Sequence, residues 1–300
     1  MSADKDRSYV LVTPARNEES YIEKTITSVI SQTLKPRKWI IVSDGSTDRT
    51  DEIVQKYASC HDFIQLETVA SSNKRNFASK VAAFNKGYAL LKNMDYEFIG
   101  NLDADVSFNP DYFEKIVQEF QTNPALGIAG GWIWEPRDGI FMERGANTTR
   151  SVPGAIQLFR RKCFEDIDGY IPVTKGGIDT VAEIKAIGSG WLVESFPQRT
   201  VLHYRRTSAG KKNVLLTRFR QGEIDYILSV HLFYQLIKLI YRTKEKPYLL
   251  GSLLRLSGYF WAFFHRERQI LPESIVMDLQ TREKIRVKNE LLNIISWRKK

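Results

Sequence analysis

The sequence predicts an α/β fold in which a mainly parallel sheet carries helices on both faces. Short apolar runs of strand length alternate with segments whose apolar residues recur at helical spacing. Three of these runs end in polar, acid-bearing residues, at 13–18, 44–48 and 103–105. Because parallel strands bring their carboxyl ends to one edge of the sheet, these residues are expected to form one ligand site.

The elements follow one another regularly as far as residue 105. Apolar runs bounded by turn residues predict strands, and apolar side chains three or four positions apart predict a helix after each of the first three strands. The predicted strands are 9–12, 39–42, 63–66 and 98–102. Ser46 or Thr47 is expected to cap the second helix, because a hydroxyl side chain accepts hydrogen bonds from the free N–H groups of a first turn.

Beyond residue 105 the pattern is less regular and finally becomes helical. Helices are predicted at 110–120 and 179–187, and strands at 127–134, 154–160, 191–196 and 200–204. From Val214 onward the sequence is helical, amphipathic and basic. We therefore expect a domain over 1–208 that carries the site and a basic helical extension over 209–300 that is able to associate with a membrane.

Composition and charge exclude several classes of protein. Of the 300 residues, 43% are hydrophobic and 26% are charged, which rules out a disordered chain. The net charge of +9 first suggests a nucleic acid or an acidic membrane as partner. However, residues 1–200 carry 24 basic and 27 acidic side chains, whereas residues 201–300 carry 20 and 8. Because residues 1–200, which carry the motifs, are net acidic, no nucleic acid partner is expected. A nucleic-acid-binding protein is kept as the non-enzymatic alternative.

The cysteines and the apolar segments bear on localisation. Cys60 and Cys163 are far apart in the sequence and form no disulfide framework. The first residues lack the apolar core of a signal peptide. The apolar stretches 226–241 and 248–264 fall short of the about 18 uninterrupted apolar residues of a spanning helix. The expected localisation is cytoplasmic, with peripheral association at the inner face of the cell membrane.

Asp103-Ala104-Asp105 is the central candidate motif. Two carboxylates separated by one small residue, directly after a strand, can both turn toward one point. Such a pair of hard oxygen ligands suits Mg2+ or Mn2+, which keep water and phosphate oxygens as their other ligands. The alternative is a turn followed by a helix start, where Asp is also common.

Five motifs in a fixed order resemble those of the family 2 glycosyltransferases of the GT-A fold. They are Thr13-Pro14-Ala15-Arg16-Asn17-Glu18-Glu19, Val42-Ser43-Asp44-Gly45-Ser46-Thr47-Asp48, Lys80 with Ala83-Phe84-Asn85-Lys86-Gly87, Asp103-Ala104-Asp105, and Gly176-Gly177-Ile178-Asp179 continuing through Gly190-Trp191 to His203. The resemblance covers residues 8–205. Each motif is common by itself, whereas their order along the chain is specific.

The resemblance implies a binding site for a nucleotide-diphosphate sugar donor. The first turn and Asp44 would bind the base and the ribose, although Asp44 as a plain turn residue is the alternative. Lys74, Arg75 and Lys80 would reach the phosphates, with a solvated basic helix start as the alternative. The expected donor-binding residues are Thr13, Pro14, Ala15, Asn17, Glu18, Asp44, Lys74, Arg75, Lys80, Asp103 and Ala104.

The resemblance also implies a metal ion and a catalytic base. Asp103 and Asp105 would bind Mn2+ or Mg2+ against the diphosphate, and His203 would complete the site, with a structural histidine as the alternative. Asp179 would take the proton of the acceptor hydroxyl in an inverting single displacement. Relatives usually carry Glu-Asp here, whereas this chain has Ile178-Asp179, so its acceptor contacts are expected to differ.

Trp191 and Glu183 are the expected acceptor contacts. Trp191 would stack on a sugar ring close to Asp179, although large aromatic side chains more often lie in the core. Glu183 would share a helical face with Asp179, and a surface pair of the two is the alternative. The expected acceptor is a saccharide or a lipid-linked saccharide in the synthesis of cell-envelope polysaccharide or glycan.

Transfer of a single sugar is expected, because the Gln-x-x-Arg-Trp motif of processive synthases is absent from the sequence. A sugar nucleotidyltransferase is the enzymatic alternative, since it would use a similar sheet and metal. Such enzymes normally carry a Gly-rich basic loop after the first strand, and residues 13–19 contain no glycine. The remaining expected partner is an anionic membrane surface that attracts the basic extension.

Overall fold

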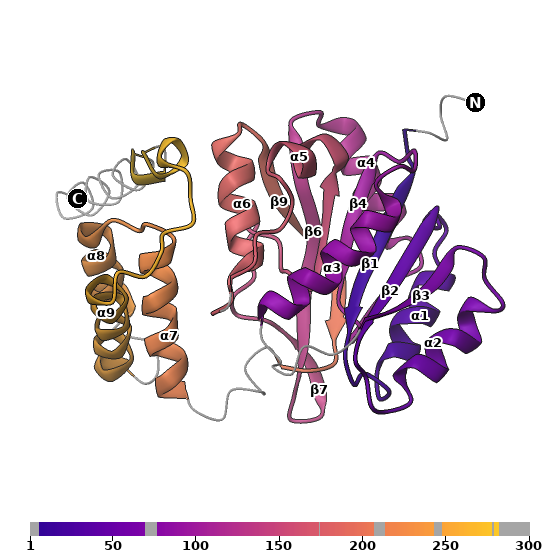
Figure 1. Cartoon of the computed structure of the whole chain (residues 1–300), viewed down its shortest axis with the longest axis horizontal. Coiled ribbons are helices and arrows are strands. Elements are labelled where there is room, and N and C mark those ends of the chain that lie inside the picture. The colour runs from indigo at the N-terminus through magenta and orange to yellow at the C-terminus, as the bar shows by residue number, and fades with distance from the viewer. Residues whose placement is uncertain are drawn as a thin grey trace, which may run out of the picture. The chain divides into compact units, whose positions relative to one another are not determined.

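The computed structural model describes residues 6–69, 77–173, 175–206, 214–242, 248–277 and 279–281. The chain divides into two compact units, Met1–Thr207 and Ser208–Lys300. The first unit is a twisted sheet flanked by helices, and the second is a group of helices (Figure 1).

A mixed sheet forms the centre of the first unit. In spatial order its strands are β3 (Ile64–Val69), β2 (Lys38–Asp44), β1 (Tyr9–Ala15), β4 (Phe98–Leu102), β8 (Ile156–Arg160), β6 (Leu126–Arg137), β9 (Leu192–His203) and β5 (Val106–Phe108), with β7 (Ile140–Glu143) paired to β6. Neighbours are parallel from β3 to β4, whereas β8 runs antiparallel to both β4 and β6. Strands β6 and β9 are parallel again, and β5 and β7 are antiparallel to their partners. The strands with the first acidic ends therefore lie in the parallel half.

Helices cover both faces of this sheet. Side chains of α1 (Ile22–Ile30), α2 (Thr50–Ala58) and α4 (Tyr112–Thr122) belong to one buried apolar cluster, and those of α3 (Phe77–Leu91), α5 (Arg161–Asp166) and α6 (Ile178–Gly188) to another. The predicted α/β fold is thereby confirmed.

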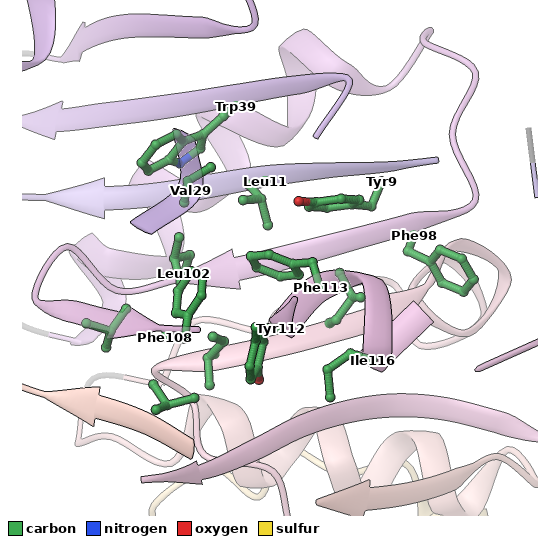
Figure 2. Packing of buried hydrophobic residues seen from close by; sticks show 14 of the residues in the cluster. Tyr9, Leu11, Val29, Trp39, Phe98, Leu102, Phe108, Tyr112, Phe113 and Ile116 are labelled. Carbon is green, nitrogen blue, oxygen red and sulfur yellow. The ribbon is translucent and has the colours of Figure 1, made fainter. Parts of the chain in front are cut away.

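Aromatic side chains dominate the core on the α1 and α4 face (Figure 2). The ring of Tyr9 stacks on that of Phe113, with 4.7 Å between the ring centroids. Trp39 is fully buried and donates its indole N–H to the Thr13 hydroxyl over 2.9 Å. Burying each such ring contributes about 2–3 kcal/mol, so the strands that end at the acidic edge are held by a rigid layer.

Several boundaries differ from the sequence prediction. Strand β1 continues through Pro14 to Ala15, beyond the predicted end. Its pairing with β4 ends at Val12, so the ladder with β4 does not need the N–H that proline lacks. The predicted strands at 191–196 and 200–204 form the single strand β9, whose register on β6 shifts between Gly131 and Trp132. The expected cap by Ser46 or Thr47 is wrong, because α2 starts at Thr50 and Asp48 accepts the Thr50 N–H.

The second unit contains α7 (Val214–Ile227), α8 (Leu232–Arg242) and α9 (Tyr248–Phe264), and the described residues include a further helical segment at 273–277. Helices α7 and α9 meet backbone to backbone: a Cβ on Gly222 would lie 1.8 Å from the Arg255 carbonyl oxygen. A buried bidentate pair between Arg255 and Asp225, at 2.5 and 2.7 Å, joins the same two helices. The helical region expected from Val214 onward is interrupted between α7 and α8, where Ser229 adopts a φ of 57°. Among the residues described, no helix has both the length and the apolarity needed to span a bilayer.

Candidate active site

The acidic edge of the sheet is assembled where β4 gives way to β5. Asp103 and Asp105 follow β4 directly, and the Asp103 N–H donates to the Ala155 carbonyl over 2.8 Å. Ala104 between them is buried, so its small side chain fits under the turn. The Lys80 ammonium from α3 lies 2.5 Å from Asp103 Oδ1. Burial lowers the pKa of Lys80, but Asp103, with Asp179 and Asp105, outweighs burial and raises that pKa above its ordinary value. The edge thus combines two carboxylates with a lysine.

His203 joins the two aspartates at the end of β9. Its Nε2 lies 3.3 Å from Asp105 Oδ1, and one ligand atom each from Asp103, Asp105 and His203 lies within 4.8 Å of the others. The second ring nitrogen, Nδ1, is buried without a hydrogen-bond partner in the described part of the chain. Two carboxylate oxygens and an imidazole form a mixed donor set that suits Mn2+ better than Mg2+. The residues therefore fit the expected metal ion.

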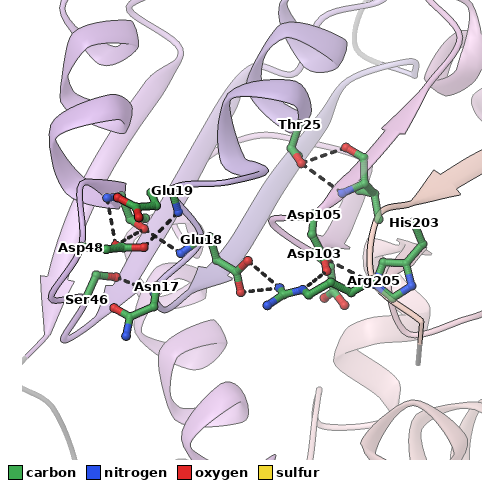
Figure 3. A network of polar contacts seen from close by, with 12 residues as sticks. Asn17, Glu18, Glu19, Thr25, Ser46, Asp48, Asp103, Asp105, His203 and Arg205 are labelled. Carbon is green, nitrogen blue, oxygen red and sulfur yellow. Dashed lines mark hydrogen bonds and ion pairs between the residues drawn. The ribbon is translucent and has the colours of Figure 1, made fainter. Parts of the chain in front are cut away.

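Arg205 crosses the centre of this edge (Figure 3). Its Nε donates to Asp105 Oδ2 over 2.6 Å, and its Nη2 donates to the two Glu18 oxygens over 2.6 and 2.5 Å. Burial raises the pKa of Asp105, but the hydrogen bonds and charges of His203 and Arg205 outweigh burial and lower that pKa to about 2. Burial raises the pKa of Glu18 above its ordinary value, with Arg205 acting in the opposite direction.

The turn after β1 contributes fewer side chains than expected. Thr13 is fully buried and accepts the Trp39 N–H, and Ala15 belongs to the apolar core. Both side chains are therefore enclosed by the fold, and donor binding by this turn stays a prediction that rests on its backbone atoms. Pro14 is half-buried, and Glu18 reaches Arg205 instead of solvent.

The two turns at the ends of β1 and β2 are joined by hydrogen bonds. Asn17 has a φ of 56°, and its side-chain oxygen accepts the Thr47 N–H over 2.8 Å. The Glu18 N–H donates to Thr50 Oγ1 over 2.7 Å, which fixes the turn on the first residue of α2. Asp44 is mostly buried at the end of β2, 3.6 Å from Arg16. Asp44 and Asn17 thus lie on neighbouring strand ends, as their motifs predict.

Asp179 lies in the first turn of α6. The helix is entered through Gly177, whose φ of 85° favours glycine, and the Thr180 N–H donates to Asp179 Oδ1 over 2.9 Å. A Cβ on Gly154 would lie 2.9 Å from Asp179 Oδ2, so any residue larger than glycine at position 154 would clash with this carboxylate. Residues 154 and 155 therefore contact the carboxylate of Asp179 on one side and the backbone of Asp103 on the other.

Glu183 is not the solvated partner of Asp179 considered above. Only 6% of it is exposed, and it accepts the Val152 N–H over 2.6 Å and the Ser151 hydroxyl over 2.9 Å. A surface pair is therefore wrong, and direct contact with an acceptor is not open to a side chain enclosed in this way. Glu183 instead connects residues 151 and 152 to α6 through these hydrogen bonds. Burial raises its pKa to about 8, helped by the charge of Asp179.

The raised pKa of Glu183 makes a testable prediction about stability. A carboxyl whose folded-state pKa exceeds its ordinary value stabilises the fold fully at low pH and loses that contribution as pH rises through the folded pKa. We expect the Tm of the wild type to fall between about pH 5 and pH 8, and Glu183→Gln to reduce this fall by several degrees. Thermal unfolding across this range measures it, with Glu52→Gln on the exposed face of α2 as control. Parallel Tm curves for wild type and Glu183→Gln would contradict the prediction.

Trp191 does not lie near Asp179. It follows the carboxyl end of α6, where its N–H donates to Ala186, whereas Asp179 lies in the first turn, about 14 Å away along the helix. Its indole N–H donates to Asp166 over 3.1 Å, at the end of β9 opposite His203. The expected position of Trp191 beside Asp179 is therefore wrong, and its contact with an acceptor stays a prediction. Trp132 and Trp134 are nearer to the acidic edge, because they pair with Thr200 and Leu202 just before His203.

Two of the expected phosphate contacts cannot be placed, and one functional residue was missed. Lys74 and Arg75 lie outside the described residues. Lys80 lies within the site but faces Asp103. Arg205 was missed because the expected motifs end at His203. The available signal was a pair of arginines, Arg205 and Arg206, directly after the last strand that leads to an acidic edge.

The amino-acid sequence is similar to those of known proteins. The sequence model described as glycosyl transferase family 2 matches residues 10–178, which is more than half of the chain. The chain belongs to glycosyl transferase family 2. Among curated family relatives, the poly-beta-1,6-N-acetyl-D-glucosamine synthase of Staphylococcus epidermidis is 32% identical over 115 residues, and that of Staphylococcus aureus strain COL is 30% identical. Each alignment covers 38% of this family 2 chain and 26% of the relative, so the chain matches about a quarter of those proteins.

Solved structures show the GT-A fold of this family 2 protein. The mannosyltransferase PcManGT of Pyrobaculum calidifontis, in complex with GDP-Man and Mn2+, has a TM-score of 0.53 at 17% identity over 93% of this chain and 80% of its own. Staphylococcus aureus TarS in complex with UDP-GlcNAc has a TM-score of 0.55 at 14% identity over 87% and 92%. At such identities the likeness establishes the fold alone.

Proposed function

We propose that this family 2 protein transfers one sugar from a nucleotide-diphosphate donor to a saccharide or lipid-linked acceptor, with inversion and with a divalent metal ion. The observation that carries the proposal is the convergence of Asp103, Asp105 and His203 at one sheet edge, with Asp179 joined to it through residues 154 and 155. Family membership favours glycosyl transfer over nucleotidyl transfer.

Each group has a defined part in the proposed reaction. Asp179 takes the proton from the acceptor hydroxyl as that oxygen attacks the anomeric carbon. Lys80 lies against Asp103, where its charge offsets the negative charge that grows on the leaving diphosphate. Bound to Asp103, Asp105 and His203, Mn2+ or Mg2+ would supply Lewis-acid stabilisation of the same leaving group. The base and ribose would bind at the neighbouring strand ends that carry Asn17 and Asp44, with Glu18 held by Arg205 beside them.

The names of the relatives narrow the choice of donor. The curated relatives are named as synthases of a polymer of N-acetylglucosamine, and one structural neighbour is a complex with UDP-GlcNAc. We therefore take UDP-GlcNAc as the first donor to test and cell-envelope polysaccharide as the first class of acceptor. Trp132 and Trp134, beside the end of β9, are our candidates for stacking on acceptor sugar rings.

The experiment is a donor panel with the purified chain. UDP-GlcNAc, other UDP-sugars and GDP-Man are incubated with Mn2+, with Mg2+ or with EDTA, and released nucleoside diphosphate is measured. Metal-dependent turnover of one donor, with a product of inverted anomeric configuration on an added saccharide, supports the proposal. Cleavage that yields a nucleoside monophosphate, or no binding of any nucleotide sugar, would refute it.

A membrane face in the second unit is the proposed partner surface, at the inner side of the cell membrane. Along α9 the side chains of Leu249, Leu253, Trp261 and Phe264 are exposed at helical spacing. Arg255, the charged residue of this helix, is buried against Asp225, so it does not interrupt the apolar face. The exposed residues Arg266 and Arg268 follow the helix and provide charge complementary to anionic lipid.

Replacing two residues of this face tests the proposed membrane contact. We expect the double substitution Leu253→Ser and Trp261→Ser to weaken binding to phosphatidylglycerol vesicles about tenfold or more, because two large apolar groups no longer enter the interface. Co-sedimentation with vesicles measures the change. Ile140→Ser, at an exposed apolar residue of β7, is the control and should bind as the wild type does. Equal binding of the double variant would reject the α9 face.

A further inference from the structure

Arg205 is a cation built into the place where a divalent ion is expected to bind. Its guanidinium lies between Glu18, from the turn after β1, and Asp105, from the turn after β4 (Figure 3). Three charge-assisted hydrogen bonds of 2.5 to 2.6 Å hold it between the two carboxylates, one from Nε to Asp105 and two from Nη2 to Glu18. The residue lies outside the range matched by the family model.

The backbone around Arg205 is fixed by the fold. The Tyr204 N–H donates to the Asp105 carbonyl over 2.9 Å, and the Tyr204 ring stacks on Tyr21 with 5.6 Å between centroids. The Arg205 guanidinium carbon lies 5.7 Å from the centroid of the Tyr21 ring. Although 38% of the Arg205 side chain is exposed, its direction is thus set by β5, β9 and the start of α1.

Both oxygens of Asp105 already face a partner in this arrangement. Its Oδ2 accepts from Arg205 and its Oδ1 faces His203 Nε2 at 3.3 Å, in a side chain that is only 4% exposed. A divalent ion on Asp103, Asp105 and His203 would have to share the charge of Asp105 with Arg205, or displace Arg205 from it. The ion and the Arg205 guanidinium would then share one carboxylate, and two cations in contact with the same group repel each other strongly in a partly buried site.

We propose that Arg205 is an internal counter-ion that competes with the divalent ion for Asp105, and that the donor's diphosphate group takes over the guanidinium when the ion binds. This inference rests on the proposed function for the ion and the diphosphate. As a consequence, the ion binds weakly by itself and more tightly together with a nucleoside diphosphate. Release of Glu18 from Arg205 then frees a carboxylate at the donor edge of β1.

Mn2+ titration of the full chain, followed by electron paramagnetic resonance of free Mn2+, tests the competition. Arg205→Met should tighten the Kd for Mn2+ alone by about tenfold and reduce the further tightening produced by UDP or GDP. Arg206→Met is the matched control, because Arg206 is exposed, carries the same charge and makes no ion pair within the described part of the chain. Its Kd for Mn2+ should equal that of the wild type.

The outcomes separate this inference from the proposed function. A Kd for Mn2+ alone that is unchanged or weaker in folded Arg205→Met overturns the competition. Absence of Mn2+ binding in both wild type and Arg205→Met refutes the metal site itself. If Arg205→Met does not fold, Arg205→Lys replaces it, because lysine keeps the charge but cannot span both carboxylates. We expect Arg205→Lys to tighten Mn2+ binding about threefold, and an unchanged Kd in this variant also overturns the inference.

Discussion

Replacing Asp179 with Asn is expected to lower the rate of sugar transfer about 10³-fold while donor and Mn2+ binding stay near their wild-type values. The amide has the shape of the carboxylate and can still accept the Thr180 N–H, which lies 2.9 Å away in the wild type. It cannot take up the proton of an attacking hydroxyl at neutral pH, so only the chemical step is affected. Initial rates on the donor and acceptor found in the panel, together with nucleotide affinity, measure the effect.

The control for this substitution is Asp166→Asn. Asp166 belongs to α5 and accepts a hydrogen bond from Trp191. Trp191 precedes the first residue of β9, whereas His203 of the proposed metal site is the last residue of that strand. Its replacement should leave the rate of transfer unchanged. Near-normal turnover of Asp179→Asn would show that another group takes the proton. Equal losses of rate in the two variants would indicate a general effect of charge removal and not the loss of a base.

The sequence was sufficient for those parts of the site that follow from strand order. Apolar runs and their acidic ends predict the parallel strands, and parallel strands must bring Asp44 and Asp103 to one edge. The position of His203 follows from the last predicted strand, 200–204, whereas its role as a ligand was implied by the family resemblance. These predictions depend on local pattern and on sheet topology, both of which are visible in a linear sequence.

The residues that were misplaced depend on features that strand order does not specify. Trp191 follows Asp179 by twelve positions in the sequence. Because α6 has eleven residues, Asp179 lies at its start and Trp191 lies beyond its end, away from the site. Glu183 shares a helical face with Asp179, yet the return of the chain at 151–157 covers that face and buries it. Arg205 approaches Glu18 across 187 positions of sequence, a contact that no local pattern encodes.

Replacing Asp105 with Asn is expected to weaken Mn2+ binding at least about 100-fold and to lower metal-dependent transfer about 10³-fold. The low pKa of Asp105, about 2, means that the carboxylate is ionised throughout the neutral range and offers its full charge to a cation. An amide oxygen keeps the shape of the ligand but carries no net charge. Isothermal titration with Mn2+, followed by rate measurements over a range of Mn2+ concentrations, gives both quantities.

The loss must be separated from a loss of folding, because Asp105 is also the partner of Arg205 and His203. Thermal unfolding of Asp105→Asn in EDTA measures the structural part, and Asp111→Asn, at the half-buried start of α4 and away from the acidic edge, is the control. If the variant unfolds near the wild-type Tm and excess Mn2+ does not restore its rate, the carboxylate acts as a ligand. Full activity of Asp105→Asn in EDTA would instead place Asp105 outside the chemistry.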